Sequence, residues 1–409
     1  MSISILSVRL QIVSIPKNVF RASSTHAILR NIFFPTKDQT LFSITETALE
    51  VSVIADVDSI QRDFIPLKSI RPDVEITKNV FKALILENDD DNSGRRINDL
   101  SALLSRVGVS IFYLSTYQED FVLVKEKRIP LVISTLQPLF NFMDIETPEN
   151  LTIQKSVSEN QQQIAITTPP AEEEEEFCFP VGSEPINICD YLKPHTSTPL
   201  SHASKDSILS TSPVFFTSNF AEKYPITKFE NEEETMAEIR KQCPKRVTGH
   251  RLRLVGLNRE FMEHMSIILI KILFFPELLE KPGDSNNESA LSAQSRFLSY
   301  TATADGISLV TDESVLDEFP EHMLNMSSVP IPLRCIQMDL SRTGSLDKYG
   351  IVYSISNPLI SSGINLLYLS TYKTANVLVQ DSDLEESLRI LDNVDAETQL
   401  ERETYEELE

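Results

Sequence analysis

Histidine and cysteine are the residues best able to bind a metal ion or to act as nucleophiles, and their spacing in this chain fits neither chemistry. None of the six histidines stands in an HExxH pair, and none of the four cysteines forms a CxxC pair. The serine-nucleophile pattern GxSxG and the phosphate-binding patterns GxGxxG and GxxxxGKS/T are missing from the sequence. The sequence therefore predicts a protein that is not an enzyme and that binds neither a metal nor a cofactor.

Composition and charge narrow the classes of partner. The 409 residues carry a net charge of −23, whereas nucleic acids and anionic membrane surfaces attract basic proteins. The most apolar stretch, Met265–Leu279, is interrupted by Lys271 and Pro276, which favours a buried helix over insertion into a membrane. With no signal-peptide pattern and no paired cysteines, we expect a cytosolic protein with reduced thiols.

The chain contains an internal duplication. SIFYLSTYQEDFVLV begins at Ser110 and NLLYLSTYKTANVLV begins at Asn365, and eight of these fifteen positions are identical. A second pair follows in the same order, because RLQIVSIP begins at Arg9 and RLRLVGLN begins at Arg251. Repetition over such a long period indicates duplicated domains rather than a solenoid of short repeats.

Each quarter of the chain shows the pattern of a small α+β module. Alternating apolar strands surround helical stretches such as Ile97–Val107, which Gly108 stops, and Arg259–Phe275, which ends before a proline. A turn at Gly350–Ile355 and a short helix at Leu359–Gly363 are expected in the last quarter. The order is β-α-β-β-α-β, with helices on one face of an antiparallel sheet. The predicted divisions are four modules at 1–75, 76–146, 249–327 and 328–395, a largely disordered linker rich in Ser, Thr, Pro and Glu at 147–248, and an acidic tail at 396–409.

Several of these strings together resemble one family. RLQIVSIP, FSITET, LSTYQEDFVLV and the second STYK with its following VLV are similar to the CASTOR-type cytosolic arginine sensors, across nearly all of both halves. The resemblance implies tandem ferredoxin-like ACT domains in two pairs and a non-enzymatic sensor that forms homodimers. It also implies a free amino acid bound between the second and fourth modules. A GATOR-type regulator of the TOR complex would be held by the protein and released by the ligand.

Matching the family motifs to this sequence gives two sets of expected site residues. The ligand-binding set is Ser110, Ile111, Asp347, Gly350, Ile351, Thr371 and Tyr372. The partner-binding set is Tyr117, Gln118 and Asp120. Backbone N–H groups beside Gly350 suit a carboxylate, while carbonyls and Asp347 suit an ammonium group, so both ends of an amino acid find partners.

Two departures from the family argue against arginine as the ligand. Lys348 and Ala375 stand where the arginine-binding members carry acidic residues. A buried guanidinium without a carboxylate partner is costly, and a nearby lysine repels it. A neutral or acidic amino acid, or no ligand at all, remains open.

Two other functions fit the same fold. One is a ligand-independent interaction scaffold, and the other is a regulatory subunit of an amino-acid biosynthetic enzyme. The repeated YLSTY core is followed by Gln118, Glu119 and Asp120 in the first half. In the second half the corresponding residues differ completely, which is expected if the two hairpins face different surroundings.

Overall fold

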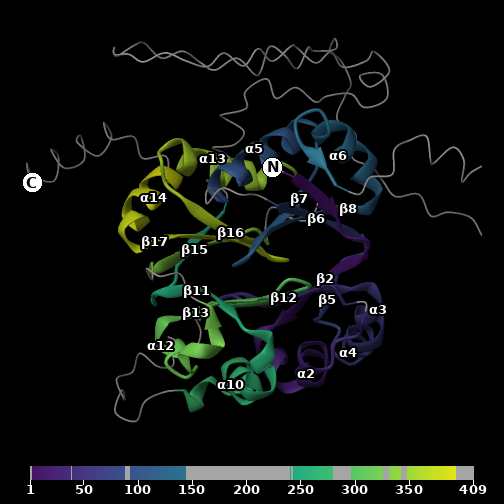
Figure 1. Ribbon diagram of the computed structural model, residues 1–409, viewed down its shortest axis with the longest axis vertical. Coiled ribbons are helices and arrows are strands. Elements are labelled where there is room, and N and C mark those ends of the chain that lie inside the picture. The colour runs from purple at the N-terminus through teal and green to yellow at the C-terminus, as the bar shows by residue number, and fades with distance from the viewer. Residues whose placement is uncertain are drawn as a thin grey trace, which may run out of the picture. The chain divides into compact units, whose positions relative to one another are not determined.

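The strands form four modules that share one order of pairing. The computed structural model describes residues 2–37, 39–87, 93–143, 240, 243–279, 296–325, 331–341 and 348–392. All of these except 142 and 143 belong to one structural unit, Met1–Asn141 together with Thr227–Glu409. Figure 1 shows the strands and helices of this unit.

Module 1 has the strand order β5–β2–β4–β3, and every neighbouring pair is antiparallel. Its helices lie on one face of this sheet, where apolar residues of both form a common core. The elements are β2 (Leu10–Pro16), α1 (Lys17–Ser23), α2 (Thr25–Phe33), β3 (Leu41–Glu46), β4 (Glu50–Asp56), α3 (Val57–Ser59), η1 (Ile60–Phe64), α4 (Ile65–Ile70) and β5 (Glu75–Ile76).

Module 2 has the order β1–β6–β8–β7, and its edge strand β1 comes from the start of the chain. The elements are β1 (Ser2–Ile5), β6 (Phe81–Glu87), α5 (Ser93–Arg106), β7 (Ile111–Ser115), β8 (Asp120–Lys125), η2 (Glu126–Arg128) and α6 (Ile129–Leu136), followed by β9 (Asn141–Phe142).

Modules 3 and 4 repeat this arrangement, with orders β14–β11–β13–β12 and β10–β15–β17–β16. Module 3 contains β11 (Leu252–Leu257), η4 (Arg259–Phe261), α10 (Met262–Phe274), η5 (Pro276–Leu278), β12 (Leu298–Thr303), β13 (Ile307–Asp312), α12 (Glu313–Leu316), η6 (Glu321–Met323) and β14 (Leu324–Asn325). Module 4 contains β10 (Lys245–Val247), β15 (Leu333–Asp339), α13 (Ile351–Ser361), β16 (Leu366–Ser370), β17 (Thr374–Gln380), η7 (Asp381–Asp383) and α14 (Leu384–Leu391). The α+β fold of repeated βαββαβ units predicted from the sequence is confirmed.

In both halves a strand that precedes one module completes the sheet of the next. Ser2–Ile5 lies within the first predicted module, yet it pairs with β6 of module 2. Lys245–Val247 lies within the predicted linker, yet it forms β10 and pairs with β15 of module 4. In each half, a strand that precedes the first module in sequence therefore becomes an edge strand of the second. The predicted end of module 4 and the acidic tail, like residues 144–239, lie outside the described residues.

Two seams join the halves. At the seam of modules 1 and 3, β3 and β12 pair over six residues, from Leu41 opposite Thr303 to Glu46 opposite Leu298. At the seam of modules 2 and 4, β7 and β16 share one paired position, Leu114 opposite Leu369. Apart from β9, the described strands therefore follow two orders of eight, β5–β2–β4–β3–β12–β13–β11–β14 and β1–β6–β8–β7–β16–β17–β15–β10. Single pairings of Leu10 with Phe81 and of Leu252 with Leu333 connect these two sheets.

The two sheets stack with an apolar layer between them. This layer takes side chains from strands of all four modules, including Ile12, Phe112, Val310 and Leu378. In Figure 1, α2 and α10 lie outside one sheet and α5 and α13 outside the other. Because both faces of a sheet are covered, strands such as β3 and β4 are buried along their whole length.

Hydroxyl side chains at the centre of the β3–β12 seam explain the mixed composition of these strands. Ser43 and Thr301 lie 2.8 Å apart, Oγ to Oγ1, and Thr45 and Ser299 lie at the same distance. Their neighbours on the opposite face are apolar and pack under the helices. Pairing each hydroxyl with another satisfies polar groups that would otherwise be buried alone.

Glycine ends the first helix of modules 2 and 4 in the same way. Gly108 has φ 68° and Gly363 has φ 79°, a conformation that favours glycine. The following residues close the motif, since Val109 N donates to Leu104 O and Ile364 N donates to Leu359 O, at 2.9 and 3.0 Å. The predicted stop at Gly108 is confirmed.

Helix α13 corrects the prediction of a turn followed by a short helix. It runs without interruption from Ile351 to Ser361 and contains Pro358. Proline has no N–H to donate to the carbonyl four residues earlier, which is that of Ser354. Arg240 Nη1 donates to this carbonyl oxygen at 2.7 Å, so the helix continues through the proline.

We expect Arg240→Ala to lower the free energy of unfolding by about 1–3 kcal/mol, because the carbonyl of Ser354 loses a donor at a buried site. Chemical denaturation of the full chain measures this change. Pro358→Ala restores an N–H at the position that faces the same carbonyl, so Arg240→Ala should cost less in that background. Equal costs in both backgrounds would contradict the role assigned to Arg240.

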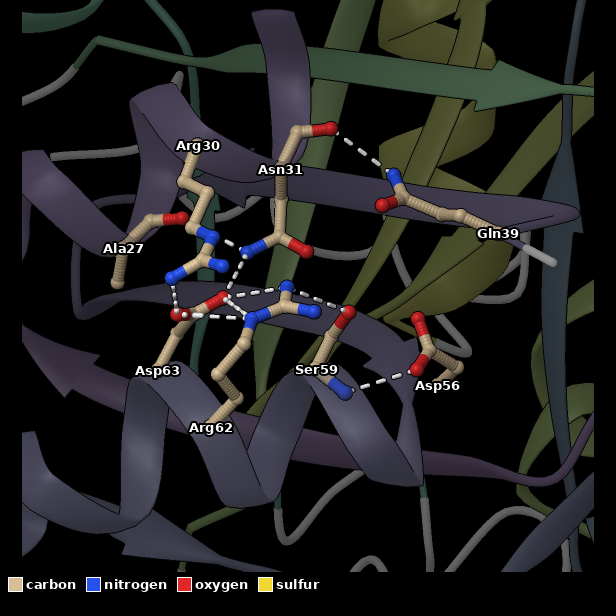
Figure 2. A network of polar contacts seen from close by, with 8 residues as sticks. All are labelled: Ala27, Arg30, Asn31, Gln39, Asp56, Ser59, Arg62 and Asp63. Carbon is tan, nitrogen blue, oxygen red and sulfur yellow. Dashed lines mark hydrogen bonds and ion pairs between the residues drawn. The ribbon is translucent and has the colours of Figure 1, made fainter. Parts of the chain in front are cut away.

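A polar network fixes the two helical segments of module 1 against each other (Figure 2). The carboxylate of Asp63 in η1 accepts from Asn31 Nδ2 of α2 at 3.0 Å and from Arg62 Nη2 at 2.7 Å. Arg30 Nη1 lies 3.6 Å from the same carboxylate. At the start of the segment, Asp56 accepts from Ser59 N at 2.8 Å and caps it. These contacts explain how a buried carboxylate and a π-helical turn are held inside a small module.

Candidate functional site

Four predicted ligand residues gather at one end of the seam between modules 2 and 4. Since β7 and β16 run antiparallel with Leu114 opposite Leu369, the start of β7 and the end of β16 lie together. Ile111 opens β7 directly after Ser110, and Thr371 and Tyr372 follow β16. Residues at least 260 positions apart in sequence therefore come to the same place.

Side-chain hydroxyls hold this seam where main-chain pairing is short. Tyr113 N donates to Ser370 Oγ at 3.0 Å, and Tyr368 N donates to Ser115 Oγ at 3.1 Å. The rings of Tyr113 and Tyr368 meet edge to face with centroids 6.4 Å apart. The YLS string common to both repeats therefore supplies the contact between the two modules.

The start of α13 lies next to this seam. The helix contacts β7 and packs beside α5 (Figure 1). Gly350 precedes it with φ 81°, and its carbonyl accepts the first helical bond, from Ser354 N at 2.8 Å. Gly350 and Ile351 are buried, and no side-chain hydrogen bond caps this end among the described residues. Such a helix start presents backbone N–H groups and favours negative charge. Asp347 lies outside the described residues.

The hairpin that contains Thr371 and Tyr372 is fixed to module 1. Thr371 Oγ1 donates to the carboxylate of Glu50 at 3.0 Å, and Lys373 N donates to the same carboxylate at 2.6 Å. Tyr372 N donates to Ser52 Oγ at 3.1 Å. The hydroxyl of Thr371 thus serves the contact between modules 4 and 1.

Glu50 is a buried carboxylate at the centre of this contact. Ser14 Oγ donates to it from β2, in addition to the two donors of the hairpin. Burial raises the pKa of Glu50 above the ordinary glutamate value, although the hydrogen bonds and the charge of Lys373 act in the opposite direction. Lys373 Nζ lies 2.6 Å from Glu75, which adds an ion pair at the edge of the contact.

The equivalent hairpin of module 2 is fixed to module 3. Tyr117 N donates to Ser308 Oγ at 2.7 Å, and Ser308 Oγ donates to Gln118 Oε1 at 3.2 Å. The ring of Tyr117 lies over Gly256, where an added Cβ would stand 2.9 Å from Tyr117 Cδ1. Close approach of this ring explains the glycine at position 256. Gln118 is exposed and Tyr117 is half-buried.

Asp120 is buried, whereas a residue that binds a partner protein should be exposed. Its side chain is 2% exposed, and Arg96 Nη2 of α5 lies 2.8 Å from its carboxylate. The negative charge of Asp120 adds to burial in raising the pKa of Tyr113 well above its ordinary value. Asp120 therefore holds α5 against β8 inside module 2.

Sequence reasoning missed Glu50, Ser52, Ser308 and Arg96. A charged residue that opens the apolar strand EVSVIA is the one local signal for Glu50. The two serines look like ordinary strand positions, since their partners come from hairpins of another module. The described residues contain no group of three or more His, Cys, Asp or Glu side chains placed to hold a metal ion. None of the described helices is long and apolar enough to cross a membrane.

The strand order is that of four repeated βαββαβ modules, and comparison with protein families gives their class. Residues 83–138 and 328–393 match the model described as ACT domain, which corresponds to modules 2 and 4. Residues 244–328 match the model described as cytosolic arginine sensor for mTORC1 subunit 1/2, ACT-like. The chain therefore contains ACT domains.

Curated relatives extend the similarity along almost the whole chain. The cytosolic arginine sensor for mTORC1 subunit 1 of Homo sapiens is 22% identical over 377 residues, covering 90% of both chains. The Pongo abelii protein of the same name gives the same identity and coverage. The Mus musculus protein is 21% identical over 370 residues, covering 88% of this chain and 87% of its own. The resemblance to the cytosolic arginine sensors found in the sequence is confirmed.

Proposed function

We propose that this chain is a non-enzymatic, cytosolic amino-acid-binding protein that regulates TOR-complex signalling in response to nutrients. The observation that carries the proposal is the meeting of Ser110, Ile111, Thr371 and Tyr372 at one end of the module 2–4 seam, beside the start of α13. The names of the relatives support the regulatory role, because those proteins are cytosolic arginine sensors for mTORC1.

The chemistry at this end of the seam suits a zwitterion. Backbone N–H groups at the start of α13 bind the ligand's carboxylate, and the helix dipole favours its charge. The Ser110 hydroxyl and nearby carbonyls accept hydrogen bonds from the ammonium group, and Asp347 is proposed as its charged partner. A ligand held this way contacts both modules at once.

We propose a neutral amino acid as the ligand. Lys348 is exposed directly before the start of α13 and brings positive charge to the approach. Ala375 is buried in β17 opposite Met338, so no carboxylate projects from that position toward a guanidinium. The relatives sense arginine by name, so arginine belongs among the ligands to be tested.

The first test is the thermal stability of the full chain with each free amino acid. A ligand that binds the native state alone raises stability by about 2.7 kcal/mol at a hundredfold excess over Kd. We expect one neutral amino acid to do so. Ser110→Ala should weaken its binding about tenfold through loss of a hydrogen bond. Ser361→Ala, at the exposed far end of the same helix, is the matched control and should bind normally.

A sample that is well folded but shows no shift with any amino acid would reject the ligand and favour a ligand-independent scaffold of the same fold. A shift that Ser110→Ala and Ser361→Ala both leave unchanged would move the ligand away from the module 2–4 seam.

The two hairpins connect the proposed ligand site with the proposed partner-binding surface. The ligand end of the seam adjoins the Thr371 hairpin, which Glu50 fixes to module 1. A ligand that stabilises one arrangement of modules 2 and 4 thereby stabilises one arrangement of the whole unit.

We propose that a GATOR-type complex is bound near the exposed Gln118 and released by ligand. Affinity capture with and without the amino acid tests this, and recovery of an amino-acid biosynthetic enzyme would favour the regulatory-subunit function.

We also propose that the chain forms a homodimer through the helical face of modules 1 and 3. Large apolar side chains lie exposed on helices that cover the same sheet, among them Phe34 at 75% and Ile70 at 76%, with Ile267 and Leu278 across the seam. We expect Phe34→Asp to convert a dimer into single chains in light scattering. Leu139→Asp, a change at an exposed apolar residue of module 2, should leave the mass unchanged. A wild-type protein with the mass of one chain would reject the dimer.

A further inference from the structure

Three basic side chains surround one buried carboxylate at the seam of modules 1 and 3. Glu46, the last residue of β3, is 2% exposed. Lys17 Nζ lies 3.3 Å and Arg21 Nη2 3.1 Å from Glu46 Oε1, and Arg296 Nη1 lies 3.9 Å from Glu46 Oε2. The cluster therefore carries more positive than negative charge.

Arg296 is the unusual member of this cluster. It is 6% exposed, and neither Nη1 nor Nη2 has a hydrogen-bond partner among the residues that the structure describes. A guanidinium offers five donors, and burying it without partners is costly. Its distance of 3.9 Å from Glu46 is too long for a hydrogen bond. The two Nη atoms form a fork whose geometry matches a carboxylate or a phosphate group.

Two acidic groups near Arg296 face the three cations of the cluster. Asp312 is the other acidic group near Arg296, and burial raises its pKa despite the nearby charges of His250 and Arg296. Burial lowers the pKa of Arg296 and of Lys17, as expected for cations held away from water. Lys17 and Arg21 are partly exposed, with side chains 19% and 32% accessible, so the cluster reaches solvent along α1.

The opposite end of the same seam has no acidic residue at the position equivalent to Glu46. Because Glu46 pairs with Leu298 and Phe42 pairs with Ala302, the pseudo-twofold relation of β3 and β12 places Ala302 in the position equivalent to Glu46. The charge at Glu46 is therefore not a requirement of the seam itself.

We propose that Arg296, Arg21 and Lys17 form a binding site for a small oxyanion, the carboxylate or phosphate group of a metabolite. The oxyanion accepts hydrogen bonds from Nη1 and Nη2 of Arg296, and Glu46 holds Arg21 and Lys17 in place beside it. This site lies on the module 1–3 seam, apart from the amino-acid site proposed on the module 2–4 seam. It gives the unit a second ligand-binding site.

The test measures the melting temperature of the full chain against sodium phosphate and sodium succinate, with sodium chloride at equal ionic strength. We expect a saturable rise with one or both oxyanions and none with chloride. The phosphate and succinate arms identify which group the site prefers. Arg296→Gln should weaken the saturable binding at least tenfold, while Arg71→Gln, which removes an exposed paired arginine of module 1, should leave it unchanged.

Arg296→Gln is expected to fold, because Glu46 keeps Lys17 and Arg21 as partners. If it does not fold, Arg21→Gln at the partly exposed end provides the second variant, with a smaller loss of oxyanion affinity. A shift that is the same in wild type and in both variants would show a general salt effect and overturn the proposal. The absence of any saturable shift in wild type would overturn it equally.

Discussion

Asp120→Ala is expected to lower the free energy of unfolding by about 3–5 kcal/mol, the range for removing one partner of a buried ion pair. The carboxylate of Asp120 lies 2.8 Å from the guanidinium of Arg96, a largely buried side chain of α5. Without it, the guanidinium is left in a site with little water and beside the hydroxyl of Tyr113. Urea denaturation of the purified chain measures the change.

This result separates a structural role of Asp120 from a role on the partner-binding surface. Gln118→Ala, an exposed change in the same hairpin, loses one hydrogen bond to Ser308 and should cost only about 0.5–1.5 kcal/mol. If Asp120→Ala kept full stability and lost only capture of the partner, the carboxylate would belong to the interaction surface after all. If Gln118→Ala alone lost capture, the exposed part of the hairpin would carry that interaction.

Glu50→Ala is expected to lower the free energy of unfolding by about 3 kcal/mol, since each buried donor left unpaired costs about 1–3 kcal/mol. The donors are Ser14 Oγ, Thr371 Oγ1 and Lys373 N, from two different modules. The loss should also free the Thr371 hairpin from module 1. Hydrogen exchange of the hairpin amides, read beside the denaturation midpoint, measures both effects.

Glu50→Gln is the matched control and has the opposite effect at neutral pH. Burial raises the pKa of Glu50 above its ordinary value of 4.5, so the folded state binds this proton more tightly than the unfolded state. The resulting stability is fully present below the unfolded pKa and is lost as pH rises through the folded pKa. Wild type should therefore lose stability relative to Glu50→Gln between mildly acidic pH and pH 7.5. A difference that is constant with pH would show that Glu50 titrates normally.

Local features of the sequence were sufficient to predict most helices and strands of each module. Gly108 and the FFP strings ended helices where their backbone chemistry requires, and the YLSTY repeat identified equivalent strands and hairpins. The prediction was wrong at α13 because Pro358 normally stops a helix. Its continuation depends on Arg240, which lies 114 residues from Ser354 in sequence. No pattern within the helix reports such a donor.

The candidate site, too, could be predicted from the sequence only in part. The motif positions of Ser110, Gly350 and Tyr372 came from the sequence, and their relation to the seam rests on the pairing of Leu114 with Leu369. Whether a polar residue faces a ligand, a partner or another module depends on the direction of its side chain and on what lies opposite. Thr371 faces Glu50 although it belongs to the repeated YLSTY string, and Asp120, close to the other copy of that string, faces Arg96.

The sequence by itself determined the duplication, the order of elements in each module, the relationship to the cytosolic arginine sensors and the acidic character that disfavours nucleic acid as a partner. These depend on residue types and short spacings, which the chain carries locally. Only the tertiary structure decided that β1 and β10 complete neighbouring modules, that two hairpins cross to the opposite sheet, and that Arg296 is buried without hydrogen-bond partners. The reason is physical, because strand pairing and burial join residues that lie far apart along the chain, and local sequence does not specify which surfaces meet.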